Sequence, residues 1–157
     1  HDIRNFKAFY RKNKVKKGGI EELIKKSDVV TLHLPLDDST KNIMNEERLQ
    51  MLKSGAVLIN LARGGLIDEA ILKKMLLEKR IAGAALDVFE VEPPIDKELL
   101  TMDNVLITPH IGASTEEAIR AMGMAAIDGL DNAKDPLEFI SFKGPIFILY
   151  FKFFNIP

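Results

Sequence analysis

The stretch that decides the fold is AVLINLARGG, residues 56–65. Its first six residues form a nearly continuous apolar run, which is typical of a strand buried on both faces of a parallel sheet. The run ends before Arg63, and the two glycines behind it let the backbone turn sharply and lie close to a bound molecule. An arginine at the carboxyl end of such a strand lies where open α/β sheets bind ligands, and its planar guanidinium suits a carboxylate. Considered without the rest of the sequence, Arg63 is more simply interpreted as a surface arginine in a turn.

Composition places the chain among ordinary globular proteins. Of its 157 residues, 46% are hydrophobic and 29% are charged, so we expect a real core. A net charge of -1 predicts no general affinity for nucleic acid, and no apolar run is long enough to span a membrane. The absence of cysteine and the three scattered histidines predict neither disulfides nor a zinc site. No signal peptide is visible, so the expected location is cytoplasmic, and a start at His1 is compatible with a fragment or a processed product.

The N-terminal segment, residues 4–17, is strongly basic. Its seven Lys and Arg residues are interleaved with Phe6, Phe9 and Tyr10, a pattern that can mark a nucleic-acid surface. We favour a solvated helix face with its aromatic side chains turned inward, because acidic residues elsewhere balance the charge.

From residue 20 onward, helix and strand patterns alternate. The predicted strands are residues 29–34, 56–61, 83–89 and 105–108. The predicted helices are residues 20–27, 46–52, 69–79 and 114–130. Asn45 and Asp68 are the expected N-caps of the second and third helices, and Ser114 with Glu117 forms a capping box at the start of the fourth. This alternation predicts right-handed βαβ units, and hence an α/β fold with a Rossmann-like, doubly wound parallel sheet.

Three polar side chains follow three different predicted strands. These are Arg63, Glu92 and His110, and the carboxyl ends of parallel strands meet at one edge of a sheet. An imidazole can exchange a proton with a hydroxyl or carbonyl group at neutral pH, and a neighbouring carboxylate stabilises its charged form. Arg63 would hold a substrate carboxylate in a fixed pose. No side chain accepts a hydride, so a redox reaction here would need a cofactor.

Several segments resemble one family. NLARGGLID (60–68), AALDVFEVEPP (84–94) and ITPHIGAST (107–115) resemble the three signatures of the D-isomer-specific 2-hydroxyacid dehydrogenases, and within that family the phosphoglycerate dehydrogenases most closely. SDVVTLHLPL (27–36) and STEEAIRAMG (114–123) agree as well, so the resemblance covers about residues 20–132.

The resemblance implies a role for each residue of the site. Arg63 would bind the carboxylate and carbonyl of a small 2-hydroxy or 2-keto acid, His110 would be the acid/base and Glu92 its partner. The implied cofactor is NAD, with contacts from Asp2, Leu34, Leu61, Ala62, Arg63, Asp87, His110 and Gly112. Asp87 would meet the nicotinamide carboxamide, and Asp2 the adenine ribose hydroxyls, which favours NAD over NADP. For Asp2, an exposed residue near a chain end is an equal alternative. The family also implies a homodimer when the protein is intact.

The sequence departs from the family pattern at both ends. It contains no G-x-G-x-x-G, so we expect the pyrophosphate-binding turn, its strand and its helix to be absent and the sheet to be incomplete. We interpret residues 1–132 as a partial NAD-binding domain and residues 133–157 as an atypical tail where the substrate domain would resume. The missing strand would lie beside residues 29–34, and one hypothesis is that the apolar segment 146–151 pairs there. The alternative is that the tail packs elsewhere or not at all.

The leading hypothesis for function is part of an NAD-dependent oxidoreductase. It would interconvert a D-2-hydroxy acid and its 2-keto acid, with D-3-phosphoglycerate and 3-phosphohydroxypyruvate of serine biosynthesis as the first candidates. A glyoxylate or hydroxypyruvate reductase is the next alternative. The others are an NAD(H)-sensing binding protein and a fragment without activity of its own.

Overall fold

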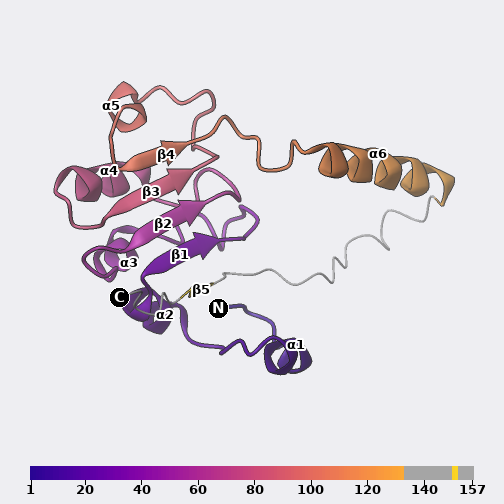
Figure 1. Cartoon of the computed structure of the whole chain (residues 1–157), viewed down its shortest axis with the longest axis horizontal. Helices are drawn as coiled ribbons and strands as arrows, with labels where there is room; N and C mark the ends of the chain where they lie inside the picture. Colours follow the sequence, from indigo (N-terminus) through magenta and orange to yellow (C-terminus); the bar gives the residue numbers. More distant parts are fainter. Residues whose placement is uncertain (133–149, 152–157) are drawn as a thin grey trace, which may run out of the picture.

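A computed structural model of the chain describes residues 1–132 and 150–151, and Figure 1 presents it. The strands are β1 (Val29–Leu32), β2 (Val57–Asn60), β3 (Gly83–Leu86), β4 (Val105–Ile107) and β5 (Tyr150–Phe151). The helices are α1 (Lys7–Lys12), α2 (Ile20–Lys26), α3 (Glu46–Gln50), α4 (Glu69–Leu77), α5 (Lys97–Leu100) and α6 (Glu116–Asp131). The predicted elements are therefore found in the predicted order, with strands a few residues shorter than expected. The short helix α5 was not predicted.

The strands form one sheet in the order β4-β3-β2-β1-β5. β1, β2, β3 and β4 run parallel, and Leu58 at the centre pairs with Val30 on one side and Ala84 on the other. The predicted Rossmann-like parallel sheet is confirmed. Because the four strands share one direction, the segments that follow them all emerge at the same edge of the sheet (Figure 1).

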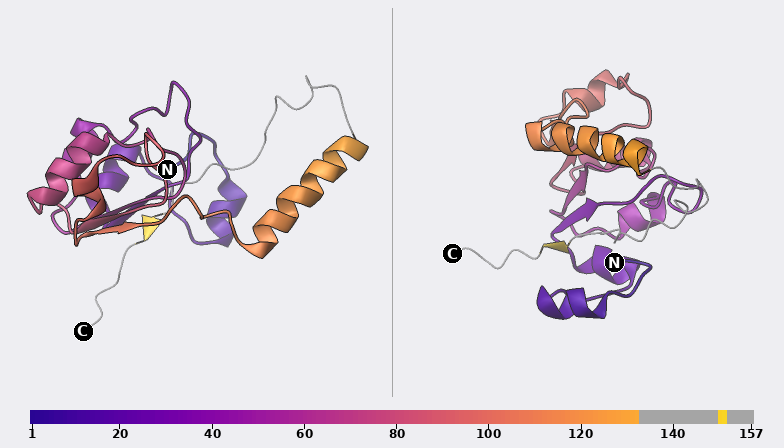
Figure 2. Two further views of the ribbon diagram at one scale, coloured as in Figure 1. Left: turned by 90° about the horizontal axis from the view of Figure 1, so that it is seen from above. Right: turned by 90° about the vertical axis from the view of Figure 1, so that its right-hand side faces the viewer.

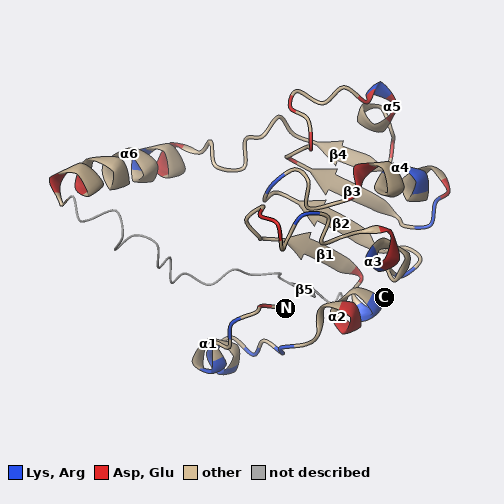
Figure 3. Cartoon of the chain, turned by 180° about the vertical axis from the view of Figure 1, so that it is seen from behind, with Lys and Arg blue, Asp and Glu red and all other residues tan. Residues whose placement is uncertain are grey.

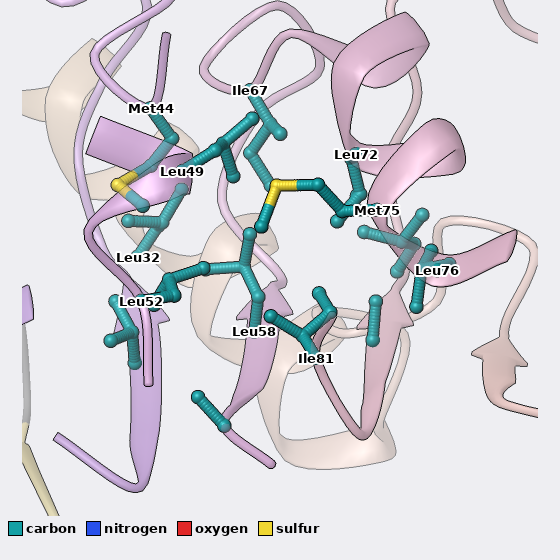
Figure 4. Close-up of a cluster of buried hydrophobic side chains, with 14 of the residues drawn as sticks. Leu32, Met44, Leu49, Leu52, Leu58, Ile67, Leu72, Met75, Leu76 and Ile81 are labelled. Atoms are coloured by element: carbon teal, nitrogen blue, oxygen red, sulfur yellow. The ribbon is translucent and has the colours of Figure 1, made fainter. Parts of the chain in front are cut away.

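The core lies between one face of this sheet and the helices α3 and α4 (Figures 2 and 4). Leu58 is fully buried there, among Leu32, Leu49 and Leu72. On the other face Val57 and Ile59 are only partly buried. The prediction that this strand is buried on both faces is therefore wrong in the part of the chain that the structure describes, because the core helices cover one face.

The predicted N-caps hold at two helices and shift at a third. Asn45 accepts a hydrogen bond from the amide of Arg48 at 3.0 Å, and Asp68 accepts one from the amide of Ile71 at 3.1 Å. The cap of α6 is Thr115 rather than the predicted Ser114. The amide of Ser114 instead closes a turn onto the carbonyl of Ile111 at 2.9 Å, so the helix starts one residue later. Helix α6 projects away from the sheet and buries none of its residues (Figures 1 and 2).

The basic N-terminal segment forms the short helix α1, which lies apart from the core helices (Figure 3). The basic side chains of α1 are exposed to solvent, as expected. The expectation that its aromatic side chains turn inward is wrong, because no residue of α1 is buried. Phe9 remains 38% exposed and packs edge-on against Tyr10, with 6.4 Å between the ring centroids.

Two residues of the C-terminal segment occupy the place hypothesised for it. Tyr150 and Phe151 pair antiparallel with Val30 and Val29 at the edge of β1. The rest of the hypothesised strand, residues 146–149, lies outside the described residues. Among the described helices, none has the length and apolar character that crossing a membrane requires.

The one-sided core predicts that two leucines on opposite faces of the sheet differ in their contribution to stability. Leu58→Ala removes a side chain with 0% exposure, and we expect it to lower the free energy of unfolding by about 3 kcal/mol. Leu106→Ala, at a position 68% exposed, is the matched control and should cost less than about 0.5 kcal/mol. Urea unfolding followed by circular dichroism measures both values. Equal losses would contradict this assignment of the core.

Candidate active site

The turn that carries Arg63 is shaped by a buried amide. Asn60, the last residue of β2, is 2% exposed. Its Oδ1 accepts a hydrogen bond from the amide of Ala62 at 3.1 Å, and its Nδ2 donates one to the carbonyl of Arg63 at 2.8 Å. Arg63 itself is exposed, and its Nη1 donates to the carbonyl of Ala62 at 2.6 Å. The sequence pattern placed Asn60 within an apolar run and did not predict this role. A polar residue at a buried strand position directly before a turn was the available signal.

The same turn lies against the loop that follows β3. A Cβ atom built on Gly64 would lie 1.8 Å from the carbonyl oxygen of Phe89, far inside van der Waals contact. The close approach expected at these glycines is therefore made to the protein's own backbone. Gly65 adopts a φ of 75°, which completes the sharp turn. The Arg63 turn and the loop of Phe89 consequently pack directly against each other.

The structure brings Glu92 and His110 together, as the sequence analysis expected. Glu92 Oε2 lies 2.8 Å from His110 Nδ1, and Glu92 Oε1 accepts a hydrogen bond from the amide of Phe89 at 3.0 Å. The bond with His110, followed by that from Phe89, lowers the pKa of Glu92, so the group is a carboxylate at neutral pH. An ionised carboxylate only accepts hydrogen bonds, so Nδ1 carries the hydrogen and Nε2 is left to exchange a proton.

Asp87 holds the loop that presents His110. This carboxylate is 2% exposed and accepts three hydrogen bonds, from the hydroxyl of Thr108 at 2.5 Å and from the amides of Ile111 and Gly112 at 2.8 Å each. Burial acts to raise the pKa of Asp87, but the bonds from Thr108, Ile111 and Gly112 outweigh it and lower the pKa. The bonds fix the loop in which His110 adopts a φ of 55°, a conformation that few residues with a Cβ adopt. Thr108 is a further residue that the sequence analysis missed.

These groups line a cavity of about 270 Å³ at the carboxyl ends of β3 and β4. Asp87, Glu92 and His110 contribute to its wall, together with Pro93. Arg63 does not line it. The Arg63 turn adjoins the cavity through the contact of Gly64 with Phe89. A larger hollow of about 630 Å³ lies at the opposite, amino ends of these strands, where no histidine lines it.

The remaining predicted cofactor contacts also follow the parallel strands. Leu34 comes after β1, Leu61 and Ala62 come after β2, and Gly112 lies in the His110 loop after β4. All four positions therefore lie at the edge that carries the Glu92–His110 pair.

Asp2 is buried, so the alternative that it is an exposed residue near a chain end is wrong. It is 5% exposed, and its Oδ1 accepts a hydrogen bond from the amide of Arg4 at 2.7 Å. Its Oδ2 is also buried and has no hydrogen-bond partner within the described residues. Because an unpaired buried acceptor is costly, this oxygen fits a hydroxyl donor from a bound molecule.

Comparison with known proteins identifies the family. The model of the D-isomer specific 2-hydroxyacid dehydrogenase, NAD binding domain, matches residues 3–112. A D-3-phosphoglycerate dehydrogenase of Methanocaldococcus jannaschii is 55% identical over 104 residues, which are 66% of this chain and 20% of that protein. A hydroxypyruvate reductase of Thermotoga maritima is 46% identical over 112 residues, covering 69% of this chain and 37% of that protein.

Solved structures agree. The NAD complexed form of a D-isomer specific 2-hydroxyacid dehydrogenase from Lactobacillus delbrueckii ssp. bulgaricus superposes with a TM-score of 0.74 at 35% identity, over 86% of this chain and 46% of that one. The chain therefore belongs to the D-isomer-specific 2-hydroxyacid dehydrogenase family, and its residues 3–112 match that family's NAD-binding domain. It spans less than half the length of these relatives.

The contact between the two loops predicts a strong effect of one added methyl group. Gly64→Ala places a Cβ against the backbone of Phe89, and we expect it to lower the free energy of unfolding by about 1–3 kcal/mol. It should also shift the amide resonances of Phe89 and Glu92 in ¹H–¹⁵N NMR spectra. The control is Gly123→Ala on α6, where nothing lies within 4 Å and no loss is expected. Equal behaviour of the two variants would show that the loops do not touch.

Proposed function

We propose that the protein containing this chain interconverts a D-2-hydroxy acid and its 2-keto acid with NAD. The observation that carries the proposal is the hydrogen bond of 2.8 Å between Glu92 and His110, in the wall of a cavity at the carboxyl ends of a parallel sheet. An imidazole paired with a carboxylate at such an edge suits proton exchange with a hydroxyl or carbonyl group. Membership of the dehydrogenase family supports the same reaction.

Each polar residue of the site has a part in this reaction. Arg63 binds the substrate carboxylate and so orients the carbon that is oxidised or reduced. During reduction, His110 gives a proton from Nε2 to the carbonyl oxygen, and during oxidation it takes the hydroxyl proton back. Glu92 stabilises the imidazolium through Nδ1. The bound cofactor would supply the hydride to that carbon as NADH during reduction and accept it as NAD⁺ during oxidation.

The cofactor would lie along the edge formed by the strand ends. Asp2 offers its unpaired buried oxygen to the adenine ribose hydroxyls, and a carboxylate there disfavours the 2′-phosphate of NADP. Leu34, Leu61, Ala62 and Gly112 would line the path of the dinucleotide. Asp87 has accepted three hydrogen bonds from its own chain, so a contact with the nicotinamide carboxamide would use its remaining lone pair.

The substrate proposed first is the pair D-3-phosphoglycerate and 3-phosphohydroxypyruvate, because a D-3-phosphoglycerate dehydrogenase is 55% identical to this chain. A hydroxypyruvate or glyoxylate reductase is the second candidate, because relatives with these names are 46% and 52% identical. Oxidation of NADH by the full-length protein, with 3-phosphohydroxypyruvate, hydroxypyruvate, glyoxylate and pyruvate in turn, separates them. Failure on every acid would overturn the proposed function.

Replacement of Arg63 tests its carboxylate-binding role. Arg63→Gln loses a charge-assisted bond to the substrate, so kcat/KM for the preferred keto acid should fall about 10- to 100-fold. The KM for NADH should change much less. Arg120→Gln, an exposed arginine on α6, is the matched control and should leave both constants unchanged. A similar loss in both variants would remove Arg63 from substrate binding.

The Glu92–His110 pair predicts the direction of a pH effect. The bond with His110 lowers the pKa of Glu92, so the carboxylate stays charged, and the pair intact, to a pH below the ordinary glutamate range. Reduction needs the imidazolium, which loses its anionic partner in Glu92→Gln. The fall of reductive kcat/KM with rising pH should therefore begin at a lower pH in this variant. An unchanged pH profile would contradict the role given to Glu92.

A further inference from the structure

The loop that carries Glu92 is held by a carboxylate from a distant part of the chain. Glu69 Oε1 accepts a hydrogen bond from the backbone amide of Glu90 at 2.6 Å, across 21 residues of sequence. Glu69 is the first residue of α4 after the capping Asp68. Leu72 and Met75 of the same helix are buried in the core, so Glu69 is attached to the rigid part of the fold.

The anchored amide lies next to the one that positions Glu92. The amide of Phe89 donates to Glu92 Oε1 at 3.0 Å, and Glu92 Oε2 makes the bond with His110. Phe89 and Glu90 share a peptide bond, so fixing the amide of Glu90 also limits where Phe89 can lie. A continuous path therefore leads from α4 to the imidazole. It runs from Glu69 to the amide of Glu90, through the backbone of Phe89 to Glu92, and from Glu92 to His110.

The surroundings of Glu69 do not favour a negative charge at this position. Burial raises the pKa of Glu69, the bond from the amide of Glu90 opposes this, and the carboxylates of Glu90, Asp96 and Glu92 raise it further. Lys73, one turn along α4, is engaged by Asp96 at 2.8 Å and by Glu98 at 2.7 Å. A half-buried acid among other acids is unfavourable unless its oxygen is needed as an acceptor.

We propose that Glu69 is a positioning residue that holds the loop of Glu92 so that Glu92 stays in contact with His110. This inference rests on the proposed function, in which that pair handles the proton. It predicts that the acceptor oxygen of Glu69 matters and that its charge does not.

Two substitutions separate the oxygen from the charge. Glu69→Ala removes both, whereas Glu69→Gln keeps an acceptor oxygen. Glu46→Ala is the matched control, because Glu46 is likewise the first residue of its helix after a capping Asn45. The readout is the pKa of Glu92, from a ¹³C NMR titration of its side-chain carboxyl group in the full-length protein. This measurement needs neither substrate nor turnover.

Loss of positioning and loss of charge shift that pKa in opposite directions. In Glu69→Ala the bond to His110 loosens, so the pKa of Glu92 should rise toward its ordinary value. In Glu69→Gln a neighbouring acid is removed and the contact kept, so the pKa should stay or fall. Glu46→Ala should leave it unchanged. No rise in Glu69→Ala, an equal rise in Glu69→Gln, or a rise in the control would each overturn the proposal.

Two further measurements complete the test. In the unaltered protein the Glu90 amide should exchange slowly with solvent, and an unprotected amide would overturn the proposal even if Glu69→Ala failed to fold. With NADH and the preferred keto acid, Glu69→Ala should lower kcat about 10- to 100-fold and leave the KM for NADH unchanged. An unaltered protein that turns over no keto acid would overturn the proposed function, while the NMR result would still decide the role of Glu69.

Discussion

The parallel alignment of β1 to β4 is the constraint on which the rest of the structure depends. In an antiparallel sheet the segments after successive strands emerge at opposite edges, whereas here they all emerge at one. Arg63, Asp87 and His110 are far apart in sequence, yet each follows a strand that ends at this edge. The direction of the strands therefore accounts for the assembly of the site.

The strand ends alone do not give the site its shape. The loops are shaped by side chains that accept hydrogen bonds from backbone amides. These side chains are Asn60 in the Arg63 turn, Asp87 in the His110 loop and Glu69 at the loop of Glu92. A buried carboxylate is costly when isolated, and at Asp87 hydrogen bonding outweighs that cost, as the lowered pKa of this group indicates. The loops are thereby fixed by the protein's own hydrogen bonds, which would reduce the reorganisation that the proposed reaction requires.

The sequence predicted what depends on local pattern. The order of the elements along the chain, the caps at Asn45 and Asp68, and the meeting of Glu92 with His110 all follow from periodicity, capping chemistry and family signatures. It did not reveal what depends on tertiary neighbours. Thr108 and Glu69 acquire their roles only when their partners, 21 residues away in both cases, are brought beside them by the fold.

The sequence-based errors have the same origin. The cap of α6 lies one residue later than predicted because the amide of Ser114 donates to the carbonyl of Ile111 in a turn. The aromatic residues of α1 are not buried. The burial of Asp2, which the sequence left open between two alternatives, could not be inferred from a position near the start of the chain. Each of these outcomes was decided by packing or hydrogen bonding outside the local pattern.

Glu92 holds His110 through Nδ1 and leaves Nε2 for the proposed proton transfer. The ¹⁵N chemical shifts of the imidazole ring, recorded on the full-length protein at a pH where the ring is neutral, report which nitrogen carries the hydrogen. We expect a protonated Nδ1 and an unprotonated Nε2. A neutral ring protonated at Nε2 would contradict it, because Nδ1 could not then donate to the carboxylate.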